Sequence, residues 1–138
     1  MDYKKHIAVS VPPSVFIFYK FGIIEGVLFF LSSFLIDIDH VFDYVLLNKR
    51  KFKIKEFFEA CENGELDKVL LFFHSIEILI LGIVIFWNSI YVFLFLGALY
   101  HVIFDSFTNL LNPFGYFLIY RVYVGLKRER FIRKWEEQ

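Results

Sequence analysis

Four long apolar runs, separated by short polar stretches, dominate the chain, and each run predicts a helix. The runs cover residues 7–19, 21–36, 69–87 and 90–111. A transmembrane helix needs about 20 apolar residues, so the fourth run is long enough to cross a bilayer. The second run could continue as a helix to residue 47, whereas the first is short and contains Pro12 and Pro13. We expect the first segment to be tilted or interfacial.

The remaining stretches predict shorter elements. Residues 48–68 are strongly charged, and the apolar pattern around residues 54–62 predicts a short amphipathic helix. Asn112 and Pro113 end the fourth run, because proline cannot continue the hydrogen-bond ladder of a helix. The aromatic segment 114–126 is too short and too basic to span a bilayer, so we expect it to lie along the interface and to lead into a basic helical tail.

The composition is typical of a membrane protein. Hydrophobic residues make up 58% of the 138 residues and the mean hydropathy is +0.57, whereas soluble domains are about 45–50% apolar. We therefore predict an all-α, polytopic integral membrane protein with about four short transmembrane helices and an interfacial C-terminal helix. Residues 1–115 would form a membrane-embedded domain with the functional site, and residues 116–138 an amphipathic basic tail. The single cysteine, Cys61, excludes an intramolecular disulfide.

The distribution of charge predicts an orientation, although the formal net charge is +0. Basic residues gather near the N-terminus, in residues 49–55 and in residues 121–134. Cytoplasmic loops carry the excess of lysine and arginine, and four crossings would place all three basic regions on the cytoplasmic side. We expect a multi-pass protein of the inner (cytoplasmic) membrane with both termini in the cytoplasm.

His101 and Asp105 interrupt the fourth apolar run, which is otherwise uncharged. Residues four apart share one face of a helix, so the two side chains could hold one metal ion between them. Ionisable residues at membrane depth are costly and are usually functional. The structural alternative is a neutral histidine that is hydrogen-bonded to a buried acid and holds helices together.

Residues of the same types recur near the predicted cytoplasmic ends of the other runs. They are His6, then Asp37, Asp39 and His40 in the motif LIDIDH, and His74 in the motif FHS. At a rise of about 1.5 Å per helical residue, all of them can reach one layer together with His101 and Asp105. We predict that these side chains bind one or two divalent transition-metal ions. Mixed imidazole and carboxylate ligands favour zinc, with manganese or iron as alternatives.

Two further carboxylates are candidates for the catalytic base. Glu77 follows His74 at the i, i+3 spacing of carboxylate-bridged di-metal helices, and Asp43 shares a helical face with Asp39. A metal ion acidifies its bound water, and a carboxylate that is not a ligand would accept the proton. Structural roles remain open, because Asp37 and Asp39 point apart on a regular helix and His74 with Glu77 could be a buried pair.

The order of these motifs resembles the family of membrane-bound metal-dependent hydrolases that includes the LexA-binding, inner-membrane-associated hydrolases. That family has an early histidine, an LPDIDH-like motif, a THS-like motif and an SHLLLDxxT-like motif followed by a glycine. Here His6, LIDIDH, FHS and YHVIFDSFTNLLNPFG take these places, over roughly residues 6–115. The chain departs from the family pattern at Ile36 (proline), at Phe73 (threonine) and at Val69 (often a second histidine).

The resemblance and the recurring residues together predict a membrane-embedded metal-dependent hydrolase that acts on a phosphoester or a lipid-linked substrate at the cytoplasmic face. Membrane lipids and a small-molecule or lipid substrate are the expected partners, and no nucleic acid is expected. The alternative is a non-catalytic membrane interaction or scaffold protein with a buried polar cluster. A metal-ion carrier is disfavoured, because the candidate ligands gather toward one side of the membrane.

Overall fold

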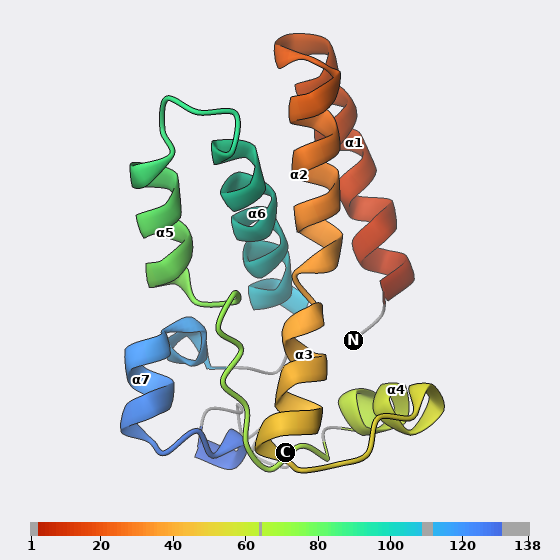
Figure 1. The fold of residues 1–138 in the computed structure, drawn as a ribbon, viewed down its shortest axis with the longest axis vertical. Coiled ribbons are helices and arrows are strands. Elements are labelled where there is room, and N and C mark those ends of the chain that lie inside the picture. Colours follow the sequence, from red (N-terminus) through yellow and green to blue (C-terminus); the bar gives the residue numbers. More distant parts are fainter. Residues whose placement is uncertain (1–2, 64, 109–111, 131–138) are drawn as a thin grey trace, which may run out of the picture.

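The structure, a computed structural model, describes residues 3–63, 65–108 and 112–130, and the regular elements of these residues are helices (Figure 1). In chain order they are α1 (Tyr3–Phe21), α2 (Ile23–Leu35), α3 (Ile38–Phe42), the π-helical turn η1 (Asp43–Leu47), α4 (Ile54–Asn63), α5 (Ile76–Ile85), α6 (Val92–Thr108), the 3-10 turn η2 (Pro113–Tyr116), α7 (Leu118–Tyr123) and the 3-10 turn η3 (Arg128–Arg130). The apolar runs thus fold as several helices of unequal length.

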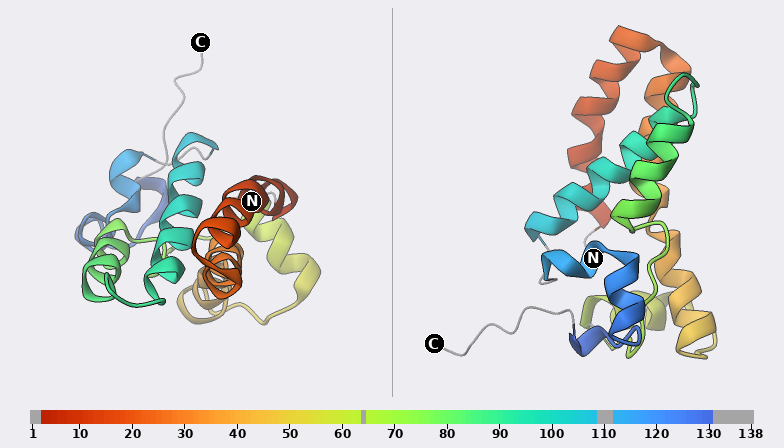
Figure 2. Two further views of the ribbon diagram at one scale, coloured as in Figure 1. Left: turned by 90° about the horizontal axis from the view of Figure 1, so that it is seen from above. Right: turned by 90° about the vertical axis from the view of Figure 1, so that its left-hand side faces the viewer.

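The four longest apolar helices stand side by side in the order α1, α2, α6, α5 (Figures 1 and 2). The chain reverses between α1 and α2 at Gly22, whose φ of 138° is a conformation that other residues rarely adopt. A break at Ile36 and Asp37 separates α2 from α3, which continues below it. Helices α4 and α7 lie on either side of α3 in this lower layer (Figure 1).

Helices α2 and α6 approach each other closely at Gly97 of α6, which is buried. A Cβ atom at this position would overlap the backbone oxygen of Phe29 and the hydroxyl of Ser32. Glycine therefore allows the two backbones to come together. One turn further along α6, His101 reaches the carbonyl oxygen of Ser33 in the last turn of α2.

Replacing Gly97 with alanine is expected to lower the free energy of unfolding by about 1–3 kcal/mol, because the added methyl group overfills a packed contact. Urea unfolding followed by circular dichroism measures the change. Val84→Ala is the control, since Val84 is 67% exposed on α5, and it should alter the same quantity by less than about 0.5 kcal/mol. A Gly97→Ala protein as stable as the parent would contradict the close approach.

Two apolar clusters hold the helices in place. One joins η1 and α4 to the loop before α5 and to the chain after α7; its buried residues are Tyr44, Phe57, Ala60, Leu66, Val69, Leu71 and Val124. The other joins the end of α2 to α5, α6 and η2; its buried residues are Ile36, Leu79, Ala98, Val102 and Tyr116. Because Ile36 precedes Asp37 and Val102 follows His101, the second cluster fixes the backbone beside both of these polar residues.

The predicted polytopic integral membrane protein, with about four short transmembrane helices and an interfacial C-terminal helix, is wrong. Among the described residues, no helix combines the length and the apolar character that a membrane crossing requires. Helices α2, α5 and α6 have 13, 10 and 17 residues, and α1, with 19 residues, includes Lys4, Lys5 and Lys20. The same finding overturns the predicted multi-pass location in the inner membrane with cytoplasmic termini.

The third apolar run, residues 69–87, differs most from its prediction, because its helix α5 begins only at Ile76. The residues before Ile76 form a loop whose amides bind carboxylates of α3 and η1.

Two predicted segments lie outside the described residues. They are the end of the fourth run, at residues 109–111, and the basic tail from residue 131 onward. The predicted boundary after residue 115 falls within η2.

Candidate metal centre

Five ionisable side chains from separate parts of the chain meet near the break between α2 and α3. They are His6 of α1, Asp37 of the break itself, His74 of the loop before α5, and His101 and Asp105 of α6. Among the described residues, their potential ligand atoms form two groups of three, with the atoms of each group within 4.8 Å of one another. We call these the Asp37 triad (Asp37, His74, His101) and the Asp105 triad (His6, His101, Asp105). Buried histidine and aspartate side chains therefore lie at metal-binding distance.

The spacing in the Asp37 triad fits a shared ion better than hydrogen bonds. Oδ1 of Asp37 lies 3.5 Å from Nε2 of His74 and 3.4 Å from Nε2 of His101. These distances exceed the usual N–H···O range of about 2.7–3.2 Å. Ligands bound at about 2.0–2.1 Å in a tetrahedron stand about 3.3 Å apart. All three atoms are buried and lack a hydrogen-bond partner, as ligand atoms do before an ion binds.

The second nitrogen of each imidazole in the Asp37 triad is held in place. Nδ1 of His101 donates to the carbonyl oxygen of Ser33 at 2.8 Å, and Nδ1 of His74 lies 3.2 Å from Oδ2 of Asp39. Ser33 lies in the last turn of α2, where carbonyls lack helical amide partners. A carbonyl can only accept, so Nδ1 of His101 carries a hydrogen, and Nε2 is the nitrogen that can bind a metal ion once its own proton is displaced. Such partners orient metal-binding imidazoles.

Protons are bound tightly at this centre when it holds no metal ion. Burial disfavours a charged His101, but the carboxylates of Asp105 and Asp37 outweigh burial and raise its pKa to about 10. Burial likewise opposes a charged His74, yet Asp37 and Asp39 raise its pKa. Burial acts to raise the pKa of Asp37 and of Asp105, but the facing imidazoles hold both below the usual range. A metal ion would therefore compete with protons for the imidazoles.

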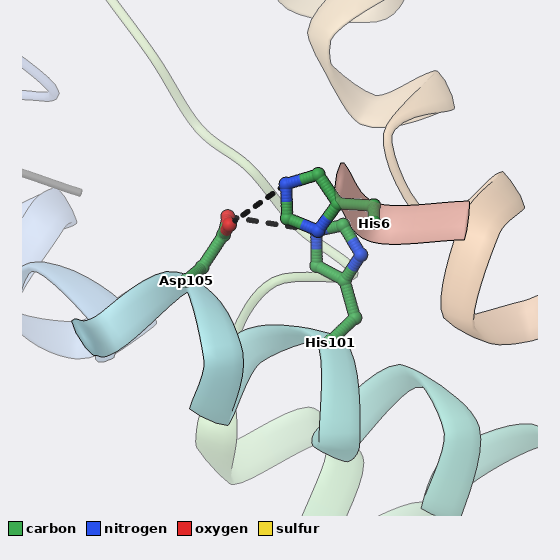
Figure 3. Close-up of side chains that lie close together, drawn as sticks. All are labelled: His6, His101 and Asp105. Carbon is green, nitrogen blue, oxygen red and sulfur yellow. Dashed lines mark ion pairs between the residues drawn. The ribbon is translucent and has the colours of Figure 1, made fainter. Parts of the chain in front are cut away.

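Figure 3 shows the three side chains of the Asp105 triad. Its His101 also belongs to the Asp37 triad. Oδ1 of Asp105 lies 3.2 Å from Nε2 of His6, and Oδ2 lies 3.5 Å from Nε2 of His101. The His6 ring stacks on the His101 ring, with centroids 4.3 Å apart and planes 16° apart. Because His101 has only one free nitrogen lone pair, it can serve an ion in one triad at a time.

Asp39 and Asp43, predicted as a metal ligand and as a catalytic base, bind backbone amides. Oδ2 of Asp39 accepts hydrogen bonds from the amides of Phe73 and His74, and neither triad includes Asp39. Oδ2 of Asp43 accepts from the amides of Leu70 and Leu71, at 2.9 and 3.1 Å. The two carboxylates, one turn apart, thus anchor the loop that carries His74. Asp37 and Asp39 serve different roles because the helix breaks at Asp37.

His40 and Glu77 also lie outside both triads. Nε2 of His40 stands 3.8 Å from Oδ1 of Asp37, and burial together with the charge of His74 lowers the pKa of His40 to about 4. The carboxylate of Glu77 accepts hydrogen bonds from the amides of Leu118 and Ile119, at 3.0 and 3.2 Å. Glu77, predicted as a catalytic base, therefore caps the first turn of α7.

Replacing Glu77 with alanine is expected to cost about 1 kcal/mol of stability, the typical loss when a helix N-terminus loses its side-chain acceptor. Zinc affinity should change by no more than about twofold, because residues without shared contacts act independently. Thermal unfolding and a zinc competition titration measure the two quantities. A large loss of zinc affinity with unchanged stability would show that Glu77 acts at the metal centre rather than as a helix cap.

Arg121 of α7 is a buried residue near this centre that the sequence prediction placed at an interface. Its side chain is fully buried, with 0% relative exposure. Nη1 donates to the carbonyl oxygen of Leu71 at 2.8 Å, and Nη2 donates to the hydroxyl of Ser75 at 2.6 Å. Arg121 is the single charged residue of the aromatic segment 114–126, and such an isolated charge can indicate a buried, functional side chain. The sequence prediction grouped it instead with the basic residues that follow.

Comparisons with protein-family models, with curated proteins and with solved structures find no match for this chain. The resemblance to membrane-bound metal-dependent hydrolases therefore stays a prediction from the motifs.

Proposed function

We propose that this chain is a metal-dependent hydrolase of phosphoesters, with one transition-metal ion held by Asp37, His74 and His101. One observation carries the proposal. Three buried atoms from α6, from the loop before α5 and from the break after α2 face one another without hydrogen-bond partners, at the spacing of metal ligands. Burial of such atoms without a partner is costly and needs an explanation.

The donor set supports a particular class of ion. Two imidazole nitrogens and one carboxylate oxygen suit zinc, manganese or iron, whereas magnesium and calcium prefer oxygen ligands throughout. Three protein ligands are typical of catalytic zinc sites, which keep a position open for water or substrate. Because the Asp37 and Asp105 triads share the single free nitrogen of His101, we propose one ion rather than two.

Asp105 is the best-placed residue for the proton transfer. When bound, a divalent ion polarises a phosphoryl oxygen and acidifies a water molecule. Asp105 lies beside His101 outside the Asp37 triad, and its lowered pKa keeps it ionised as a proton acceptor. His6 contacts the other oxygen of Asp105 and orients the carboxylate. Water would attack phosphorus and give its proton to Asp105 as the bond from phosphorus to the leaving oxygen breaks. The leaving oxygen would take the electron pair of that bond and then the proton from Asp105, which returns the carboxylate to its ionised form.

Metal analysis together with a substrate panel tests this proposal. Protein purified without chelating resin should contain about one equivalent of transition metal and should hydrolyse bis(p-nitrophenyl) phosphate or a lipid phosphodiester. Asp105→Asn should keep the metal and lose turnover. Bound metal without turnover on any phosphoester would favour the non-catalytic alternative, in which the polar cluster only holds the helices together. Absence of metal would reject the centre.

A further inference from the structure

Arg121 grips both ends of the turn that carries His74. Its guanidinium donates to the carbonyl oxygen of Leu71, three residues before His74, and to the hydroxyl of Ser75, one residue after it. The Ser75 hydroxyl itself donates to the same Leu71 oxygen at 3.1 Å. One fully buried side chain from α7 therefore closes a turn that is far from it in sequence.

The turn needs such a clamp, because its backbone is unusual. Leu71 has a φ of 46°, in the left-handed region that residues other than glycine rarely adopt. Asp43 holds the amide of Leu71, and Arg121 holds its carbonyl. The two contacts grip opposite ends of one residue and fix the direction in which the chain enters the His74 turn.

The charge of Arg121 also matters. Burial lowers its pKa to about 10, while Asp43, Glu77 and Asp39 act in the opposite direction. Arg121 therefore stays positively charged at neutral pH. Burial raises the pKa of Asp43 to about 6, and the nearby charge of Arg121 acts in the opposite direction.

We propose that Arg121 is a positioning residue of the metal centre. It clamps the turn from Leu71 to Ser75 so that Nε2 of His74 faces Asp37 and His101. The inference rests on the metal centre proposed above and assigns it a residue outside the motifs on which the prediction of that centre was based.

Titration with Co²⁺ tests this role, since the visible spectrum of bound cobalt reports the ligands and their geometry. In Arg121→Met, the dissociation constant should rise about 10–100-fold, the usual effect of losing a residue that supports a ligand. The cobalt absorption bands of Arg121→Met should also shift.

Arg121→Lys should recover part of the cobalt affinity, because an ammonium group can reach one acceptor but cannot match the fork of a guanidinium. Lys127→Met, which removes an exposed charge from the same segment, should change neither quantity.

Ser75→Ala keeps the test decisive if Arg121→Met does not fold, because it removes one Arg121 contact and leaves the charge in place. It should weaken cobalt binding relative to the parent protein, and it should add little to the effect of Arg121→Lys. Folded Arg121→Lys and Ser75→Ala proteins with parental affinity and spectra would overturn the role of Arg121 alone, even if they melted at lower temperature. A parent protein that binds no cobalt would overturn the metal centre as well.

Discussion

Replacing His101 with alanine is expected to weaken Zn²⁺ binding by more than about 100-fold, the upper range for residues that only support a ligand. His101 is the one residue common to both triads in the described part of the chain. Its Nε2 faces Asp37 at 3.4 Å and Asp105 at 3.5 Å, so its removal leaves two buried carboxylates facing an empty space. Competition with a chromophoric chelator measures the change.

His40→Ala is the matched control for this substitution. His40 is partly buried beside the same cluster, but its Nε2 lies 3.8 Å from Oδ1 of Asp37 and it belongs to neither triad. Its replacement should weaken zinc binding by no more than about tenfold, the lower range for a supporting residue. Equal losses in His40→Ala and His101→Ala would show that the triads do not define the binding position.

Zinc affinity is expected to rise steeply with pH between pH 6 and 8. In the metal-free protein the pKa of His101 is raised to about 10 and that of His74 is also raised, so both imidazoles are protonated at the start of this range. Zinc binds only the neutral imidazole and must displace these protons. For each proton that zinc must displace, the dissociation constant falls about tenfold when the pH rises by one unit. Displacing one or two protons therefore lowers the dissociation constant about 10–100-fold per pH unit.

Ordinary histidines would behave differently. Their pKa of about 6.5 would make zinc affinity level off above pH 7. Here affinity should keep rising toward the pKa of His101. Calorimetry in buffers of different ionisation enthalpy should count one to two protons released per ion at pH 7. A flat affinity above pH 7 would contradict the raised pKa of His101.

Much of the helical pattern follows from hydropathy alone. The apolar runs at residues 7–19, 21–36 and 90–111 correspond to α1, α2 and α6, and the predicted amphipathic helix begins at Ile54 as in the structure. Hydropathy could not show where the third run leaves the helix. Residues 69–73 are as apolar as a helix core, but the amides of Leu70, Leu71 and Phe73 bind Asp43 and Asp39, which lie about 30 residues earlier.

Residue types and spacing predicted part of the candidate site. Every member of the two triads was among the predicted ligands, because histidines and acids stand out within apolar runs. Spacing could not distinguish a carboxylate that faces the metal centre from one that binds backbone amides of a loop. Asp37 and Asp39 belong to one motif, yet the break at Asp37 turns one toward the imidazoles and leaves the other against loop amides. Arg121 could not be assigned, since its partners lie in a distant loop.

Anomalous X-ray diffraction from crystals of the zinc-loaded protein, recorded at the zinc absorption edge, tests the metal centre most directly. We expect one strong peak within about 2.0–2.2 Å of Oδ1 of Asp37, Nε2 of His74 and Nε2 of His101, with Asp105 beside it. A peak bound elsewhere, or no peak in crystals soaked at saturating zinc, would contradict the convergence of these three side chains on one ion.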